Sequence, residues 1–198
     1  MTNSFADIRH AEVALLTGSN TPANHPVAAT FFKEAARAGT RLIVVDPRRP
    51  DLADHAWRYC RIKPGSDVAF YNSLMQVIID EHRFDKSFVD QRTEGFDDLR
   101  RVVAQYPPQR AAPICGIDAD SIREVARAIG GSKAMMIFWG MGISQHTHGT
   151  DNARCLISLC LVPNYYLIWT YAQHTLICQV VPTCNTGCYW NSKCLCNK

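Results

Sequence analysis

Residues 12–49 read EVALLTGSNTPANHPVAATFFKEAARAGTRLIVVDPRR, and this stretch decides the fold class. Two short apolar runs, 13–17 and 41–45, have the length and the continuous hydrophobicity of buried parallel strands. Between them, residues 26–38 carry apolar side chains at helical spacing and begin with a proline, which suits a first helical position. We therefore expect a β-α-β unit of about 30 residues, which builds a parallel sheet through a right-handed crossover.

The alternation of strands and helices continues along the chain. Further strands are expected at 57–62 and 134–139. One helix is expected from a cap at Ser66 or Asp67 to about residue 82, and two short helices are expected within 85–105. Two more are expected, one from a cap at Asp120 or Ser121 to Gly130, and one over 149–161 with its cap at Thr150 or Asp151. The proline-bearing stretch 106–118 is expected to be a connection. This order predicts an α/β fold: an open, mostly parallel, Rossmann-like sheet with helices on both faces. Because ligands bind beyond the carboxyl ends of the strands in such sheets, the segments 18–25, 46–50 and 140–148 are the expected binding loops.

The charge distribution argues against a nucleic-acid surface. The 198 residues carry 21 Lys and Arg against 18 Asp and Glu, and residues 1–151 hold 18 of the bases and all 18 acids. The body of the chain is therefore neutral, whereas nucleic-acid binding needs clustered positive charge. Residues 1–10 lack the apolar segment of a secretory signal, so we expect a cytoplasmic protein. Proline and amide side chains interrupt the apolar stretch 155–192, so no membrane span is expected.

The nine cysteines fall into two groups. Cys60, Cys115, Cys155 and Cys160 are scattered, and we expect them to be reduced and buried as small hydrophobic residues. The others crowd the last 21 residues: Cys178, Cys184, Cys188, Cys194 and Cys196. Their C-x3-C and C-x-C spacings differ from the paired C-x2-C units of common metal sites, so no metal site is predicted.

Two strand ends carry residues suited to a nucleotide. Gly18-Ser19-Asn20 follows the first strand, where it is equally well explained as a phosphate seat of backbone N–H groups or as a tight turn. Asp46 ends the second strand, where an acid can accept hydrogen bonds from ribose hydroxyls, and Arg48 and Arg49 can hold a phosphate. The simpler interpretation is an aspartate that caps the turn, with both arginines in solvent. The first turn has one glycine where nicotinamide-binding domains have G-x-G-x-x-G, so a plain NAD site is disfavoured.

The loop after the fourth predicted strand reads GMGISQHTHG, residues 140–149. Its two glycines, Gly140 and Gly142, permit a close approach of backbone to a ligand. His146 and His148 could bind a metal, but two histidines without a third ligand favour hydrogen bonding to a ligand instead.

Three segments resemble one family, in the same order along the chain: residues 1–81, which include LLTGSN, VVDPRRPD and KPGSD; residues 84–100, FDKSFVDQRTEGFDDLR; and residues 138–161, FWGMGISQHTHGTDNARCLISLCL. They resemble the molybdopterin oxidoreductase family, most closely the large (alpha) subunits of formate dehydrogenases. The resemblance implies an α/β domain that grips a molybdenum or tungsten bis(molybdopterin guanine dinucleotide) cofactor (bis-MGD). The cofactor-binding residues that it implies are Gly18, Ser19, Asn20, Asp46, Arg48, Gly65, Asp67, Gly140, Gly142 and Gln145.

The same resemblance implies a reaction and partners. The family members convert formate to carbon dioxide and pass electrons to iron–sulfur clusters, with a 4Fe–4S cluster expected only upstream of this region. Residues 1–162 are then part of the cofactor domain of a larger multi-domain enzyme, and 163–198 are an unrelated tail from a shifted reading frame, with a real membrane or metal-binding extension as the alternative for this tail. The implied partners are the remainder of the alpha subunit and electron-transfer subunits. No catalytic residue or metal ligand is assigned, and the chain alone is expected to be inactive. The alternatives are a non-catalytic nucleotide-binding module and another member of the family, such as a nitrate reductase.

Overall fold

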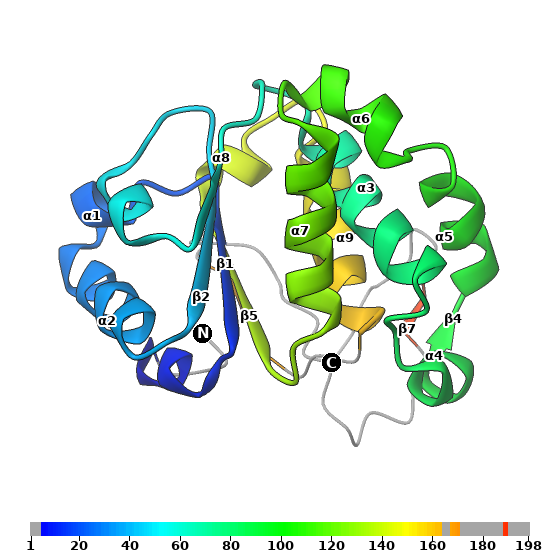
Figure 1. Cartoon of the computed structure of the whole chain (residues 1–198), viewed down its shortest axis with the longest axis horizontal. Helices are drawn as coiled ribbons and strands as arrows, with labels where there is room; N and C mark the ends of the chain where they lie inside the picture. The colour runs from blue at the N-terminus through cyan, green and yellow to red at the C-terminus, as the bar shows by residue number, and fades with distance from the viewer. Residues whose placement is uncertain (1–4, 164–166, 171–187, 190–198) are drawn as a thin grey trace.

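A parallel sheet forms the centre of the protein in a computed structural model that describes residues 5–163, 167–170 and 188–189 (Figure 1). Its strands are β1 (Val13–Thr17), β2 (Arg41–Val45), β3 (Arg58–Cys60), β5 (Met135–Trp139) and β6 (Leu167–Thr170), in the order β3-β2-β1-β5-β6. Every neighbouring pair in this sheet is parallel. The chain runs outward from β1 through β2 to β3 and then returns to the other side of β1 as β5. The order of the strands therefore reverses between β1 and β5.

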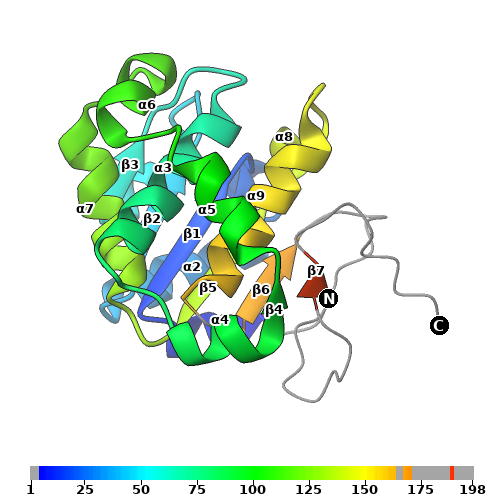
Figure 2. The same ribbon diagram turned by 90° about the vertical axis from the view of Figure 1, so that its right-hand side faces the viewer.

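Helices cover both faces of the sheet (Figures 1 and 2). On one face lie the 3-10 helix η1 (Phe5–His10), α2 (Pro26–Arg37) and the 3-10 helix η2 (Asp51–His55), with the short α1 (Thr21–Asn24) beside them. On the other face lie α3 (Asp67–Asp80), α6 (Pro108–Cys115), α7 (Ala119–Gly130) and α9 (Gly149–Leu161). The remaining elements are α4 (Lys86–Arg92), α5 (Phe96–Val103), α8 (Met141–Ser144), and a two-stranded pair of β4 (Thr93–Glu94) with β7 (Cys188–Tyr189).

The two hydrophobic layers follow from the alternation of side chains along each strand. In β1, Val13 and Leu15 belong to the core cluster under α3 and α7, whereas Ala14 and Leu16 belong to the cluster under α2. All four residues are fully buried, as expected for a strand between two layers of helices. The α/β fold class predicted from the sequence is confirmed.

One predicted connection is wrong: residues 106–118 contain helix α6. Pro108 is its first residue, where the missing N–H has no intrahelical partner to lose. Pro113 lies inside the helix, but Ala111 and Cys115, four residues apart, are fully buried in the core. Packing of this face therefore outweighs the cost of the inner proline, which a count of prolines overestimates.

Two predicted helix caps are also wrong. The helix α7 is capped by Asp118, whose carboxylate accepts hydrogen bonds from the backbone N–H and hydroxyl of Ser121, and not by Asp120 or Ser121. The N-cap of α9 is His148, one residue before the predicted start of that helix. In both cases the observed cap lies two or three residues upstream of the candidates.

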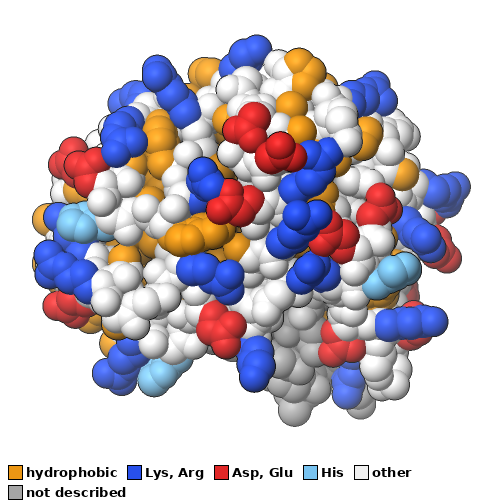
Figure 3. Space-filling model, viewed as in Figure 1, with side chains coloured by type: hydrophobic (Ala, Val, Ile, Leu, Met, Phe, Trp, Pro, Cys, Tyr) orange, Lys and Arg blue, Asp and Glu red, His pale blue; other side chains and the backbone are white. Residues whose placement is uncertain are grey.

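Charges of both signs are interspersed on the face shown in Figure 3. Several are paired between elements, as in Arg127 on α7 with Glu81 at the end of α3, and Arg58 on β3 with Glu124 on α7. In the described part of the chain, no helix has the length and the apolar character to cross a membrane.

The scattered cysteines follow the expectation from sequence. Cys60, Cys115 and Cys160 are buried, Cys155 is half-buried, and all four are free thiols. Most of the cysteine-rich end of the chain, and with it the predicted tail, lies outside the described residues. Only β6 and β7 are described there, and the extent of the tail stays a prediction.

Candidate functional site

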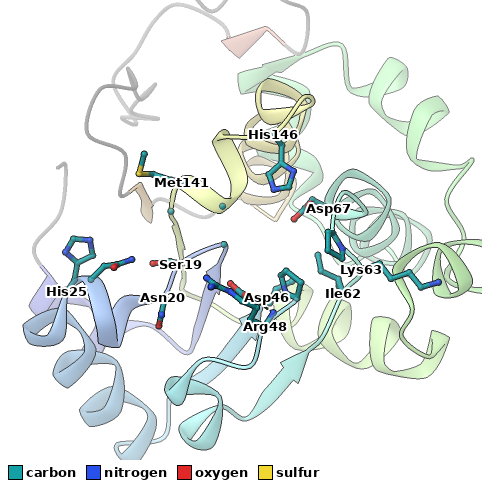
Figure 4. A pocket seen from close by; sticks show the side chains of 17 residues that line it. Ser19, Asn20, His25, Asp46, Arg48, Ile62, Lys63, Asp67, Met141 and His146 are labelled. Atoms are coloured by element: carbon teal, nitrogen blue, oxygen red, sulfur yellow. Dashed lines mark hydrogen bonds between the residues drawn. The ribbon is translucent and has the colours of Figure 1, made fainter.

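A cavity of about 500 Å³ opens at the carboxyl ends of the strands, at the point where the strand order reverses (Figure 4). It is bounded by the loop after β1, the loop after β2, the turn before α3, and the loop after β5. The segments 18–25, 46–50 and 140–148, predicted from sequence as binding loops, all contribute to it. This is the position at which open α/β sheets bind ligands.

The structure brings most of the predicted site residues together. Eight of them line the cavity: Gly18, Ser19, Asn20, Asp46, Arg48, Asp67, Gly140 and Gly142. Two do not: Gly65 sits in the turn before α3, and Gln145 is exposed at the end of α8. The backbone of Gly65 has φ of +80°, so this glycine has a structural reason to be there.

The glycines of the site pack against each other. Gly142 donates its N–H to the carbonyl of Gly18 at 3.0 Å, and Gly140 donates to the carbonyl of Thr17 at 3.2 Å. A Cβ atom on Gly142 would lie 2.7 Å from the Gly18 oxygen, and one on Gly140 would lie equally close to it. The close approach that these glycines permit is therefore between two backbone segments, and these two N–H groups are already used.

Asp46 is held by its surroundings at the edge of the cavity. It is 8% exposed, and its Oδ1 accepts a hydrogen bond of 2.8 Å from the backbone N–H of Arg48. The hydroxyl of Tyr59 donates to the Asp46 carbonyl at 3.0 Å, and this fixes the backbone as well. Burial raises the pKa of Asp46, although the hydrogen bond from Arg48 and its positive charge both lower it.

Asp67 is the second carboxylate of the cavity. It is the first residue of α3 and is 7% exposed. Burial raises its pKa, against a hydrogen bond from its own backbone N–H and the charge of His146, and the charge of Asp46 raises it further. In Figure 4 the imidazole of His146 lies over the carboxyl group of Asp67. The cavity thus holds two carboxylates with one imidazole and one guanidinium near them.

The other polar groups differ in their use. Ser19 shares a hydrogen bond of 3.0 Å with Thr21 through their hydroxyls, within the loop after β1. Lys63 lines the cavity with part of its side chain, but its Nζ donates to the carbonyl of Pro113 at 3.0 Å and so points away (Figure 4). Arg49 pairs with Asp54 and is not part of the lining. Arg48 is therefore the cation that the loop after β2 supplies to the cavity.

Sequence reasoning missed four residues of the lining, which are Val45, Ile62, Lys63 and Pro64. Asn24, His25, Pro47 and Met141 were not assigned a role, but they lie within the predicted binding loops. Val45 and Pro64 are each next to a predicted site residue, so a slightly wider window would have included them. Ile62 is different, because nothing in the sequence distinguishes an apolar residue near a strand end that lies beside a ligand from one that lies in the core.

His146 and His148 have no third metal ligand beside them in the described part of the chain. Among the described residues, no group of three or more His, Cys, Asp or Glu side chains is arranged to hold a metal ion. His148 instead lies 4.0 Å from Asp151 on the outer side of α9.

The family model for molybdopterin oxidoreductases matches residues 1–172. The chain is 40% identical, over 162 residues, to the F420-dependent formate dehydrogenase subunit alpha of Methanocaldococcus jannaschii, which covers 82% of this chain and 24% of the relative. It is 36% identical to formate dehydrogenase H of Escherichia coli over 82% of this chain and 23% of that protein. A nitrate reductase of Synechocystis is 31% identical over 80% of this chain and 22% of its own length.

A similar solved structure agrees with these relatives. Acetylene hydratase from Pelobacter acetylenicus superposes with a TM-score of 0.75 and 30% sequence identity, over 81% of this chain and 22% of that chain. The chain spans about a quarter of the length of the curated relatives that it matches.

Proposed function

The chain belongs to the molybdopterin oxidoreductase family, and from this premise we propose that its cavity holds a guanine nucleotide end of a bis-MGD cofactor that carries molybdenum or tungsten. The observation that carries the proposal is the cavity itself. Asp46, Asp67 and Arg48 surround one space of about 500 Å³ where the strand order reverses, which is within the range of small-ligand sites.

The donor set fits a nucleotide. The two carboxylates accept hydrogen bonds from hydroxyl and N–H groups, such as those of a ribose and a guanine edge. We assign the ribose to Asp46, at the end of the second strand of a β-α-β unit, and the base to Asp67, at the start of α3. Arg48 and the loop of Gly18 to Asn20 then face the phosphates.

Asp46 and Asp67 accept hydrogen bonds from a ligand when their carboxyl groups are ionised. Burial raises the pKa of both Asp46 and Asp67, so each carboxylate is unfavourable without a partner. A ligand that donates hydrogen bonds to them replaces the lost hydration. The cavity therefore selects a neutral donor-rich group at its carboxylates and an anionic group beside Arg48.

The described residues bind and orient the cofactor, and they do not exchange electrons. When bound, the cofactor supplies two-electron redox chemistry at its metal. The polar groups that face the cavity are carboxylates, one guanidinium, imidazoles, small polar side chains and backbone. These groups hold hydrogen bonds and charge, so we expect the 198-residue chain to bind a nucleotide without oxidising formate.

For the longer protein we propose the conversion of formate to carbon dioxide, with electrons passed to iron–sulfur clusters and then to further subunits. The support is that formate dehydrogenases are 35–40% identical to this chain, whereas nitrate reductases are 31–36% identical to it. Reduction of nitrate is the alternative, because the nucleotide cavity would serve both reactions. An assay of the longer protein with formate and with nitrate decides between them.

Calorimetry with GDP tests the nucleotide site in the chain itself. Asp67→Asn is expected to weaken GDP binding about tenfold, which corresponds to one hydrogen bond to a charged group. Asp80→Asn, at the exposed end of the same helix α3, is the matched control and should bind as the unmodified chain does. No binding at millimolar GDP, or equal binding by both variants, would contradict the proposal. If the 198-residue chain binds GDP and also reduces a dye with formate, the proposal that this chain only binds the nucleotide is wrong.

A further inference from the structure

A buried hydrogen bond ties the end of β1 to α3 directly beneath the cavity. Thr17 Oγ1 and the hydroxyl of Tyr71 lie 2.6 Å apart, and both side chains are buried. Thr17 is the last residue of β1 and immediately precedes Gly18. Tyr71 lies one helical turn along α3 from Asp67. The bond therefore joins the two elements that carry opposite walls of the cavity.

The hydroxyl of Tyr71 is not needed for packing. Its ring lies fully within the hydrophobic core and stacks edge-on against Phe70, with ring centroids 5.5 Å apart. A phenylalanine ring would fill the same space. Burial raises the pKa of Tyr71 well above its usual value, so the group stays a neutral phenol. What the hydroxyl adds is one directional contact in a core that is otherwise held by non-directional packing.

We propose that Tyr71 is a positioning residue of the cavity. By holding Thr17, it sets the separation between the backbone of Gly18 to Asn20 and the carboxyl group of Asp67. A ligand that spans the cavity touches both walls, so this separation decides whether both contacts form together. The consequence for a nucleotide rests on the proposed function, whereas the placement of Asp67 can be measured without any ligand.

The ligand-free test is a titration of the Asp67 carboxyl group by carbon NMR in the full 198-residue chain. Burial raises the pKa of this group. The other titratable or charged side chains that line the cavity are His25, Asp46, Arg48, Lys63 and His146. A loss of the hydrogen bond that lets Asp67 move toward solvent should lower its pKa toward the usual aspartate range. The Asp67→Asn variant lacks this signal and so identifies the resonance.

Tyr71→Phe and Thr17→Val remove the same bond from its two ends. Each is expected to lower the Asp67 pKa toward the usual aspartate range, and to weaken GDP binding about tenfold. Ile78→Val, in the same core and on the same helix but two turns further along, is the control for simple destabilisation. It should lower the melting temperature and leave both the Asp67 pKa and GDP binding unchanged.

The outcomes separate this proposal from the proposed function. If the unmodified chain binds no GDP, the nucleotide site fails, and the titration alone still decides the role of Tyr71. If Tyr71→Phe lowers only the melting temperature, as Ile78→Val does, Tyr71 acts in packing alone and the proposal is overturned. The same holds if Thr17→Val does not reproduce the effect of Tyr71→Phe.

Discussion

Replacing Gly142 by alanine has two opposite effects on the free energy of unfolding. Gly142 lies in the short helix α8, where alanine is favoured over glycine by up to about 1 kcal/mol. The added Cβ would lie 2.7 Å from the carbonyl oxygen of Gly18 and 2.8 Å from its Cα. Both are backbone atoms, so the contact is relieved only by moving the ends of β1 and β5 apart. Such overpacking costs about 1–3 kcal/mol.

The steric effect is expected to win. The net destabilisation is about 1–2 kcal/mol, which lowers the melting temperature by about 2–8 °C for a chain of this length. The hydrogen bond of 3.0 Å from the Gly142 N–H to the Gly18 carbonyl lengthens as well, and the wall of the cavity at Gly18 shifts with it. We therefore also expect GDP to bind about tenfold more weakly.

Urea denaturation and calorimetry with GDP measure both effects. Met141→Ala is the control for the stability measurement, because its side chain is 57% exposed and lies on the same short helix without this contact. It should change the free energy of unfolding by less than about 0.5 kcal/mol. If Gly142→Ala is at least as stable as the unmodified chain and binds GDP equally, the backbone contact between the two strand ends does not constrain the site, and the reasoning fails.

Two further predictions concern the walls of the cavity. Burial raises the pKa of Asp67, so the folded state binds its proton more tightly than the unfolded state, and the stability due to this group is lost as pH rises through and above the usual aspartate range. Asp67→Asn should therefore raise the melting temperature above that of the unmodified protein by more at pH 7 than at pH 4. The measurement is thermal melting of both proteins at the two pH values, and an equal rise in melting temperature at pH 7 and pH 4 would contradict the prediction. Asn152 on α9 donates a hydrogen bond of 3.0 Å to the buried carbonyl of Ile143 in α8, so Asn152→Ala should cost about 1–3 kcal/mol in urea denaturation. Thr150→Ala, exposed on the same helix, should cost far less.

The overall fold was predictable because its signals are local. Two short apolar runs around an amphipathic stretch require a β-α-β unit, and the strand ends of such units meet at one edge of the sheet. The same reasoning placed Asp46 and Arg48 in the cavity. It failed for α6, where buried Ala111 and Cys115 outweigh an inner proline. That balance depends on the partners of the helix, which are distant in sequence.

The roles of the glycines could not be predicted from their motif. A glycine after a strand admits either a ligand or another backbone, and the sequence of one loop does not contain the position of the other. Gly18 and Gly142 are 124 residues apart, yet a Cβ on either would overlap the backbone of the other. The glycine pattern therefore predicts the point where the strand order reverses. It predicts a ligand site only because ligands bind at that point.

Each strand end supplies a different kind of group to the site. The loop after β1 supplies backbone and hydroxyl groups, the loop after β2 a carboxylate and a guanidinium, the turn before α3 a second carboxylate, and the loop after β5 an imidazole. Their relative position depends on the sheet register, on the backbone hydrogen bonds between the loops after β1 and β5, and on the Thr17–Tyr71 bond. In β1, a shift by one residue would exchange Val13 and Leu15 with Ala14 and Leu16 between the two cores. The burial of these side chains therefore holds the strand ends in register, and the hydroxyl of Tyr71 then sets the gap between them and α3.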